Sequence, residues 1–297
     1  MPSGNFSRMK RDLNRLGYKN VIEIKHGSSI MLDSDLKITP YVFSPFFDSS
    51  LVVESDGVTL LNLNDSKFFG WPLSQILRKH SPITFVFRSH SNANSQLSYE
   101  IIGSKKSTLN TDEKHLNLFY KTVVKTNAKY VVPFASNHCL LHKDNFHLNN
   151  HINTPLECLE YFNNRKTSNQ ELKVMISGDS WCSTDGFKIG DQKALKNREE
   201  YLNEYQKRKN NTLEKFYEKE LRAKIRFSVI ERYFKKFLAK IPFFLKWYFK
   251  GSHILYILRR GDVLSKIVML DVYNSSVKEL ALDTNILDID KFPMQVH

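Results

Sequence analysis

Short apolar runs alternate with stretches of helical periodicity over the first 190 residues of the chain. Residues 50–54 and 58–62 are two apolar segments joined by a Ser-Asp-Gly turn, which predicts a β-hairpin. The same pattern analysis predicts further strands at residues 20–25, 82–88, 129–134 and 172–176, and helices at residues 71–80, 111–127 and 156–162. This alternation of strands and helices indicates a layered α/β fold with helices outside a sheet.

The pattern changes after residue 190. Residues 193–239 form a long charged region of helical periodicity, and its apolar stripe consists of Phe227, Ile230, Phe234, Phe237, Leu238 and Ile241. Residues 253–258 and 266–273 then predict a second β-hairpin around Arg-Arg-Gly-Asp. We therefore expect an α/β domain at residues 1–190, followed by a basic helical region plus a β-hairpin extension at residues 191–297.

The positive charge of the chain is concentrated in this second part. The formal net charge is +13, and residues 193–260 hold 19 Lys and Arg against 7 Asp and Glu. A uniformly basic nucleic-acid-binding protein is not built this way, so nucleic acid is not expected as a partner. Two readings of residues 226–260 stay open. Either Phe243, Phe244, Trp247, Phe249 and the lysines bind an anionic membrane surface, or the apolar stripe packs on the preceding domain while the lysines stay solvated.

Composition and motifs exclude several classes of protein. Three cysteines without a Cys-x-x-Cys spacing do not form a disulfide framework, which favours a reducing, cytoplasmic location, with peripheral attachment to a membrane as the second reading. The serines lack the Gly-x-Ser-x-Gly context of a nucleophilic serine. A glycine-rich phosphate loop is also absent from the sequence.

Two groups of residues are candidates for chemistry. Asp65 follows the apolar segment at residues 58–62, where a strand would hold a metal ligand in place, although the same residue would also suit a turn into the next helix. Four histidines, His138, His142, His147 and His151, lie within fourteen residues. They either fold around a metal or are polar side chains of a surface loop, and we select His138 alone as a candidate ligand.

Three segments of the sequence resemble the metallo-β-lactamase superfamily, in its branch near the hydrolase-like domain of CMP-N-acetylneuraminate hydroxylases. They are residues 48–65, residues 130–142 (Tyr-Val-Val-Pro-Phe-Ala-Ser-Asn-His-Cys-Leu-Leu-His) and residues 176–181 (Ile-Ser-Gly-Asp-Ser-Trp), in the order expected of that family. The resemblance implies a partial metal-binding set of Asp65, His138 and Asp179. It further implies that Asp65 orients the catalytic water, with zinc, iron or manganese as the divalent metal.

The sequence also departs from the family pattern. It contains no His-x-His-x-Asp-His string, and the nearest text, Arg88-Ser-His-Ser-Asn-Ala-Asn-Ser95, holds a single histidine. That text follows the hairpin, whereas the family's metal loop is expected before it, so His90 receives no ligand role. The prediction is therefore a partial metallo-β-lactamase-like αββα layered fold, its second half, completed by a separately encoded first half if it is active.

The predicted function follows from the resemblance. It is metal-dependent hydrolysis of a small polar substrate, such as a polar metabolite or sugar nucleotide. One alternative is a non-catalytic, truncated or split subunit of such an enzyme. Another is a peripheral membrane-associated protein that uses residues 226–260. Hydroxylation is disfavoured because the chain lacks the Cys-x-His and Cys-x-x-His pairs of a Rieske cluster.

Overall fold

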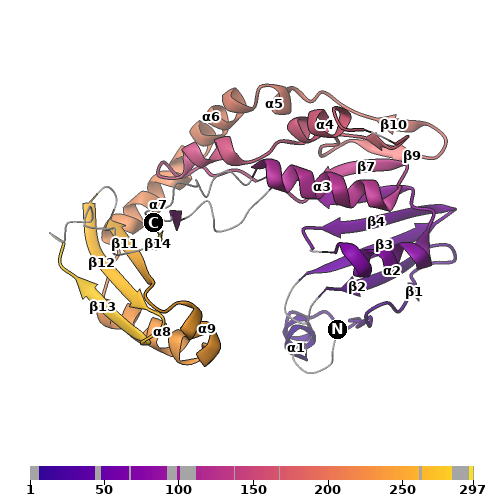
Figure 1. Ribbon diagram of the computed structural model, residues 1–297. Coiled ribbons are helices and arrows are strands. Elements are labelled where there is room, and N and C mark those ends of the chain that lie inside the picture. Colours follow the sequence, from indigo (N-terminus) through magenta and orange to yellow (C-terminus); the bar gives the residue numbers. More distant parts are fainter. Residues whose placement is uncertain are drawn as a thin grey trace. The chain divides into compact units, whose positions relative to one another are not determined.

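The structure, a computed structural model, forms two compact units (Figure 1). It describes residues 7–43, 48–66, 68–91, 99–100, 112–136, 138–166, 168–260, 263–282 and 294–296. Unit 1 consists of Met1–Asn92, Asp112–His138 and Ile152–Arg198, and unit 2 of Ala93–Thr111, Cys139–His151 and Glu199–His297. The units interleave along the sequence, so the predicted domain boundary after residue 190 stays a prediction.

Unit 1 is built on a mixed seven-stranded sheet with the strand order β1-β2-β3-β4-β5-β7-β8. The first four strands pair antiparallel, and β4, β5, β7 and β8 pair parallel. The strand bounds are Ile30–Met31, Lys37–Val42, Ser49–Ser55, Val58–Asn64, Phe85–Ser89, Tyr130–Phe134 and Glu171–Leu172. The helices of unit 1 are α1 (Ser7–Arg15), α2 (Gly70–His80), α3 (Asp112–Thr126), α4 (Pro155–Asn163) and α5 (Lys193–Lys196).

The core of unit 1 lies between the sheet and the helices that connect its parallel strands. One row of paired, buried side chains crosses five strands: Val52, Leu61, Val86, Val131 and Leu172. Helices α2, α3 and α4 pack on this row through Leu73, Ile76, Leu116, Phe119, Val123, Cys158 and Phe162. Sequential parallel strands joined by crossovers of one hand place their helices on one face, which explains this single core.

Local sequence signals account for the boundaries of these elements. The hairpin between β3 and β4 turns at Asp56 and Gly57, which both have positive φ angles, of 47° and 74°. This is the conformation that an Asp-Gly turn favours, and it confirms the predicted hairpin. Helix α4 begins with a capping box, in which Thr154 and Glu157 bond to each other's backbone N–H groups.

Aromatic side chains cover part of the opposite face of the sheet. A short hairpin of β9 (Ser180–Cys182) and β10 (Gly186–Lys188) carries Trp181 and Phe187. The ring centroids of Phe85 and Trp181 are 4.8 Å apart, and those of Tyr130 and Phe187 are also 4.8 Å apart, both edge to face. The hairpin therefore lies against strands β5 and β7.

Unit 2 combines a five-stranded sheet, of order β13-β12-β11-β14-β6, with helices. Its strands are β6 (Tyr99–Glu100), β11 (His253–Arg260), β12 (Val263–Asp271), β13 (Ser276–Leu280) and β14 (Met294–Val296). Its helices are α6 (Arg198–Arg208), α7 (Asn210–Arg222), α8 (Phe227–Ala239), α9 (Phe243–Tyr248) and the 3-10 helix Phe146–His151. Helix α8 packs its apolar stripe against the sheet, where Leu238 meets Val268, Leu270 and Val277.

Among the helices that the structure describes, none combines the length and the apolar character needed to cross a membrane.

Several predicted elements need correction. Residues 20–25 are not a strand, because no neighbouring strand pairs with this apolar segment and Ile22 stays largely exposed. The strand predicted at residues 172–176 ends at Leu172. Phe237 does not join the core stripe of α8, since it lies on the exposed side of the helix. The second hairpin is present as β11 and β12, but it belongs to a larger sheet.

A buried polar network links the antiparallel part of the sheet of unit 1 to α2. The hydroxyl of Tyr41 lies 2.7 Å from Nε2 of His80, and Nδ1 of His80 lies 3.2 Å from Oε2 of Glu54. Because a carboxylate only accepts, we assign the imidazole proton to Nδ1, so Nε2 accepts from the Tyr41 hydroxyl. Burial lowers the pKa of His80, although Glu54 acts in the opposite direction. Burial alone would raise the pKa of Glu54, but Lys37 and His80 hold it below its ordinary value.

The first prediction concerns the helix-facing core. Phe119 is 1% exposed at the centre of unit 1, so Phe119→Ala removes a large side chain and leaves a cavity. We expect a loss of about 3–5 kcal/mol in the free energy of unfolding, measured by urea denaturation. The exposed Lys121→Ala variant on the same helix is the control, and a Phe119→Ala loss as small as that of the control would contradict this core assignment.

The second prediction concerns pH. The folded pKa values of His80 and Glu54 lie below the ordinary values of 6.5 and 4.5. The unfolded chain therefore protonates His80 and Glu54 more readily than the folded chain does. The stability that these two groups contribute is fully present above their ordinary pKa values, and it is lost as pH falls through their folded pKa values. His80→Gln keeps a donor and an acceptor but does not titrate. Its urea midpoint should change less than that of the native chain between about pH 8 and about pH 5; equal changes would rule out His80 as a source of the pH dependence.

Candidate functional site

Polar side chains gather where the parallel strands of unit 1 end. Strands β4, β5 and β7 run in the same direction, so their carboxyl ends meet at one edge of the sheet. In open α/β sheets this edge is the usual place for a ligand. The residues that follow or close these strands are Asp65, Ser66, Arg88, Ser89, His90, Ser91, Ser136 and His138.

Arg88 is a buried cation at the end of β5. Its side chain is 2% exposed, and its NH1 group donates a hydrogen bond to the backbone carbonyl of Ser66. Burial lowers the pKa of Arg88 to about 10, while the negative charge of Asp65 acts in the opposite direction. Asp65 is exposed in the turn after β4. In the structure it therefore serves as a counter-charge for Arg88, a role that the sequence did not suggest.

Three serines hold the ends of β5 and β7 together. The Oγ atoms of Ser89 and Ser136 are 2.7 Å apart, and they lie 3.2 Å and 3.3 Å from the carbonyl oxygen of Ser91. One hydroxyl therefore donates to the carbonyl and accepts from the other. This buried network fixes the backbone on both sides of His90.

His90 is the least satisfied polar residue of this edge. Its side chain is completely buried, and among the described residues neither ring nitrogen makes a hydrogen bond of good geometry, although the Phe134 backbone lies close to the ring. Burial lowers its pKa to about 4, and the neighbouring groups His115, Arg198 and His138 lower it further, while the Phe134 backbone opposes them. Buried polar groups are nearly always hydrogen-bonded, so an imidazole with two unsatisfied nitrogens indicates a functional position.

His138 lies beside this group after β7. It is half-buried, and its Nδ1 atom lies 3.1 Å from the Ser136 carbonyl oxygen. Burial lowers the pKa of His138, the Ser136 carbonyl raises it, and Arg198 lowers it again. The side chain of Arg198 is held in place by a hydrogen bond of 2.8 Å that its NH1 group donates to the Ile152 carbonyl.

A cavity of about 550 Å³ opens next to His138. Its lining includes the aromatic rings of Phe87 and Phe134, the side chain of Met175 and the polar groups of Ser136, His138 and Ser177. A mostly apolar cavity with a few polar groups on one side is typical of sites for small molecules. The two rings pack against each other with centroids 5.3 Å apart, so this wall is preformed.

The three residues predicted as metal ligands occupy different settings. Both carboxylate oxygens of Asp179 accept backbone hydrogen bonds of 2.8 Å, Oδ2 from Ile176 N–H and Oδ1 from Gly190 N–H. Asp65 faces Arg88, and His138 lies at the cavity. Within the residues that the structure describes, no three His, Cys, Asp or Glu side chains form a group that suits a metal ion. The described donors thus do not make up a metal site by themselves, and the metal assignment stays a prediction.

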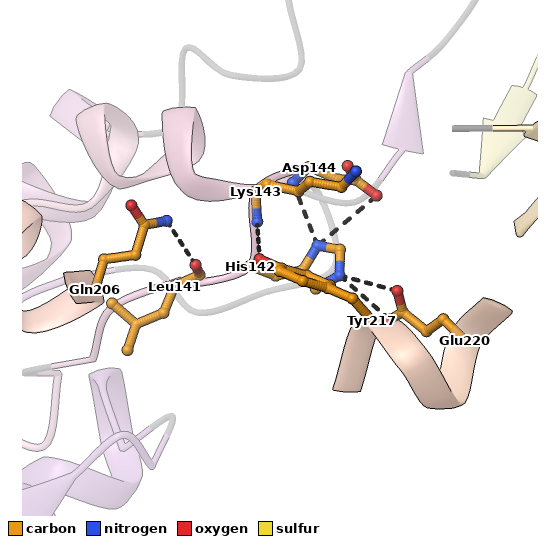
Figure 2. Close-up of polar contacts among 7 residues, drawn as sticks. All are labelled: Leu141, His142, Lys143, Asp144, Gln206, Tyr217 and Glu220. Carbon is orange, nitrogen blue, oxygen red and sulfur yellow. Dashed lines mark hydrogen bonds and ion pairs between the residues drawn. The ribbon is translucent and has the colours of Figure 1, made fainter. Parts of the chain in front are cut away.

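The remaining histidines of the segment, His142, His147 and His151, belong to unit 2, whereas His138 belongs to unit 1. His142 belongs to unit 2, where Figure 2 shows it between Asp144 and Glu220 of α7. Its Nε2 atom lies 3.2 Å from the Glu220 carboxylate, and its ring packs edge to face on Tyr217. Nearby, Gln206 of α6 donates to the Leu141 carbonyl at 2.8 Å (Figure 2). His142 therefore ties its loop to the helices of unit 2.

The residue that sequence reasoning missed is His90. The signal was present as an apolar strand that ends in Arg88-Ser-His-Ser, but periodicity alone does not reveal that the ring nitrogens lack partners. The described fold brings together Arg88, His90 and His138, and of the predicted site residues it places His138 in this group and Asp65 at its border.

Comparisons with known proteins add little. No protein-family model and no curated protein matches the sequence. Among solved structures, a mutant of CmlA beta-hydroxylase is similar to part of the chain, with 16% sequence identity and a TM-score of 0.30. The match covers 41% of this chain and 27% of the hydroxylase, well under two thirds of that protein. A likeness of this size supports no conclusion about activity, and the structure by itself is that of a mixed α/β protein.

Proposed function

We propose that the carboxyl-end site of unit 1 binds the anionic group of a small polar metabolite, a phosphate or a carboxylate. The observation that carries this proposal is the buried imidazole of His90, whose neighbour His138 lines a preformed cavity. A phosphate-bearing compound such as a sugar nucleotide, the substrate class implied by the sequence resemblance, has this chemistry.

The charges around His90 favour an anion. Burial is the largest cause of its lowered pKa, and His115, Arg198 and His138, which are cationic or become cationic on protonation, lower the pKa further. Arginine and protonated histidine form charge-assisted hydrogen bonds with phosphate and carboxylate oxygens. A bound anion would hydrogen-bond to the His90 ring, and it would offset the positive charge of the groups around that ring.

The cavity would hold the uncharged part of the ligand. Phe87 and Phe134 offer ring faces or edges on which a base or sugar ring can pack, while Ser177 offers a hydroxyl group. Phe134 is the last residue of β7 and His138 follows that strand, so the anionic and apolar parts of the site are positioned by the same strand end.

Metal-dependent hydrolysis of such a metabolite stays the finer proposal, supported by the sequence resemblance. A divalent metal would lower the pKa of a bound water. His138 and Asp65 would be its candidate ligands in unit 1, and the further ligands would come from a separately encoded first half of the fold.

The proposal of anion binding predicts a pH-dependent affinity. Binding of an anion stabilises the protonated imidazole, so the binding reaction takes up protons. The affinity for the anion should therefore rise as pH falls from about 8 to about 6. Sulfate is the probe because its own charge is constant over this range, and isothermal titration calorimetry in two buffers of different ionisation enthalpy measures the proton uptake. Absence of sulfate binding at both pH values would contradict the proposal.

The same proposal predicts a specific loss on substitution. His90→Gln and His138→Gln should each weaken sulfate binding about tenfold or more, because each removes a cationic partner of the anion. His142→Gln, the same change in unit 2, is the matched control and should leave the affinity unchanged. Circular dichroism of each variant checks the fold, and equal affinities of all three variants and the native chain would locate the anion elsewhere.

The metal proposal is tested separately by elemental analysis of the purified chain. The resemblance predicts bound zinc, iron or manganese. A content below about 0.2 ions per chain after equilibration with each metal, together with no hydrolysis of phosphoester substrates, would contradict metal-dependent hydrolysis by this chain alone. Sulfate binding can persist in that case, so the two proposals fail independently.

A further inference from the structure

The outer side of α9 carries a continuous group of exposed aromatic residues. Phe243, Phe244, Trp247 and Tyr248 are 76%, 69%, 62% and 78% exposed. At 3.6 residues per turn they fall within a sector of about 140° on the helix surface. Isolated exposed apolar residues are common in folded proteins, but four large rings side by side on one short helix are not.

The other side of α9 is already used for packing. Phe249, just after the helix, joins the hydrophobic core of unit 2, and Nζ of Lys246 donates to the Ser275 hydroxyl at 2.7 Å. These contacts fix the rotation of the helix, so the aromatic side cannot turn inward without breaking them. The exposure of the four rings is therefore imposed by the fold of unit 2.

Helix α8 carries further exposed aromatic residues. It packs on the sheet of unit 2 and precedes α9 in the chain (Figure 1). Its core side is formed by Phe227, Ile230, Phe234 and Leu238, whereas Tyr233 and Phe237 are 66% and 54% exposed. We call the exposed aromatic residues Tyr233, Phe237, Phe243, Phe244, Trp247 and Tyr248 the aromatic surface of unit 2.

Positive charge surrounds this aromatic surface. Residues 226–250 contain seven Lys and Arg side chains and one carboxylate, Glu231. Glu231 forms an i,i+4 ion pair with Lys235 at 2.7 Å. Six of the cationic residues are exposed: Arg226, Arg232, Lys235, Lys236, Lys240 and Lys250.

We propose that the aromatic surface of unit 2 binds the surface of an anionic lipid bilayer. Exposed Phe and Trp rings insert at the boundary between headgroups and acyl chains, where aromatic rings are favoured, and the flanking cations attract acidic headgroups.

Charge complementarity selects this partner over a second copy of the chain. In a two-fold symmetric dimer the same patch meets itself, which would place two sets of seven cations around one apolar interface. An anionic bilayer instead provides opposite charge around an apolar interior, so both components of the surface are satisfied at once.

Vesicle sedimentation of the full chain tests the proposal. Vesicles of phosphatidylcholine with about 30 mol% phosphatidylserine should sediment the chain at low ionic strength, and vesicles of phosphatidylcholine alone should do so at least about tenfold more weakly. Added salt should release the chain, because the headgroup attraction is screened. Failure of the anionic vesicles to bind the chain overturns the proposal.

Matched variants locate the contact. Phe244→Ser combined with Trp247→Ser should weaken binding about tenfold or more, whereas Trp71→Ser, at a 71% exposed tryptophan of α2, should not. Lys236→Gln with Lys240→Gln should also weaken binding, and Lys207→Gln with Lys215→Gln in α6 and α7 should do so less. Equal binding by the Phe244/Trp247 variant and the native chain would overturn the proposal.

Fluorescence and oligomeric state complete the test. Insertion should shift the tryptophan emission of the native chain to shorter wavelength, and Trp247→Phe should keep vesicle binding while it loses most of that shift.

Light scattering after size exclusion tests whether a second copy of the chain is the partner instead. A dimer that Phe244→Ser with Trp247→Ser converts to a monomer, without vesicle binding by the native chain, would assign the surface to a second copy instead.

Discussion

Parallel pairing of β4, β5 and β7 is the constraint on which the functional part of unit 1 depends. The buried row Leu61, Val86 and Val131 holds these strands in register, and the helices between them cover one face. Because the strands run in one direction, the polar residues that end them are brought to one edge. The serine network and Arg88 then hold that edge in place, and His90 is buried in the middle of it.

The electrostatics of this edge are unusual for a structural core. A buried guanidinium and a buried imidazole are costly unless they are paired. Arg88 has the Ser66 carbonyl and the charge of Asp65, whereas His90 faces further cationic groups. By comparison, the buried His80 lies between Tyr41 on one side and Glu54 on the other.

Unit 2 distributes its aromatic residues differently. Its sheet accepts one side of α8 and the inner side of α9, and the remaining rings are left at the surface among lysines and arginines. The site in unit 1 and the aromatic surface in unit 2 rest on separate residues and separate observations.

The sequence by itself determined the elements whose signals are local. The Asp-Gly hairpin, the helical spacing of α2 and α3 and the stripe of α8 were predictable because turn geometry and side-chain period are properties of a few consecutive residues. The segment at residues 20–25 was predicted wrongly, since a strand also needs a partner that its own residues do not specify. Only the tertiary structure decided that the charge of Asp65 acts on Arg88 and that, among the described residues, the buried ring of His90 lacks a hydrogen bond of good geometry. Burial, pairing and charge environment arise between segments far apart in the chain, and no local pattern encodes them.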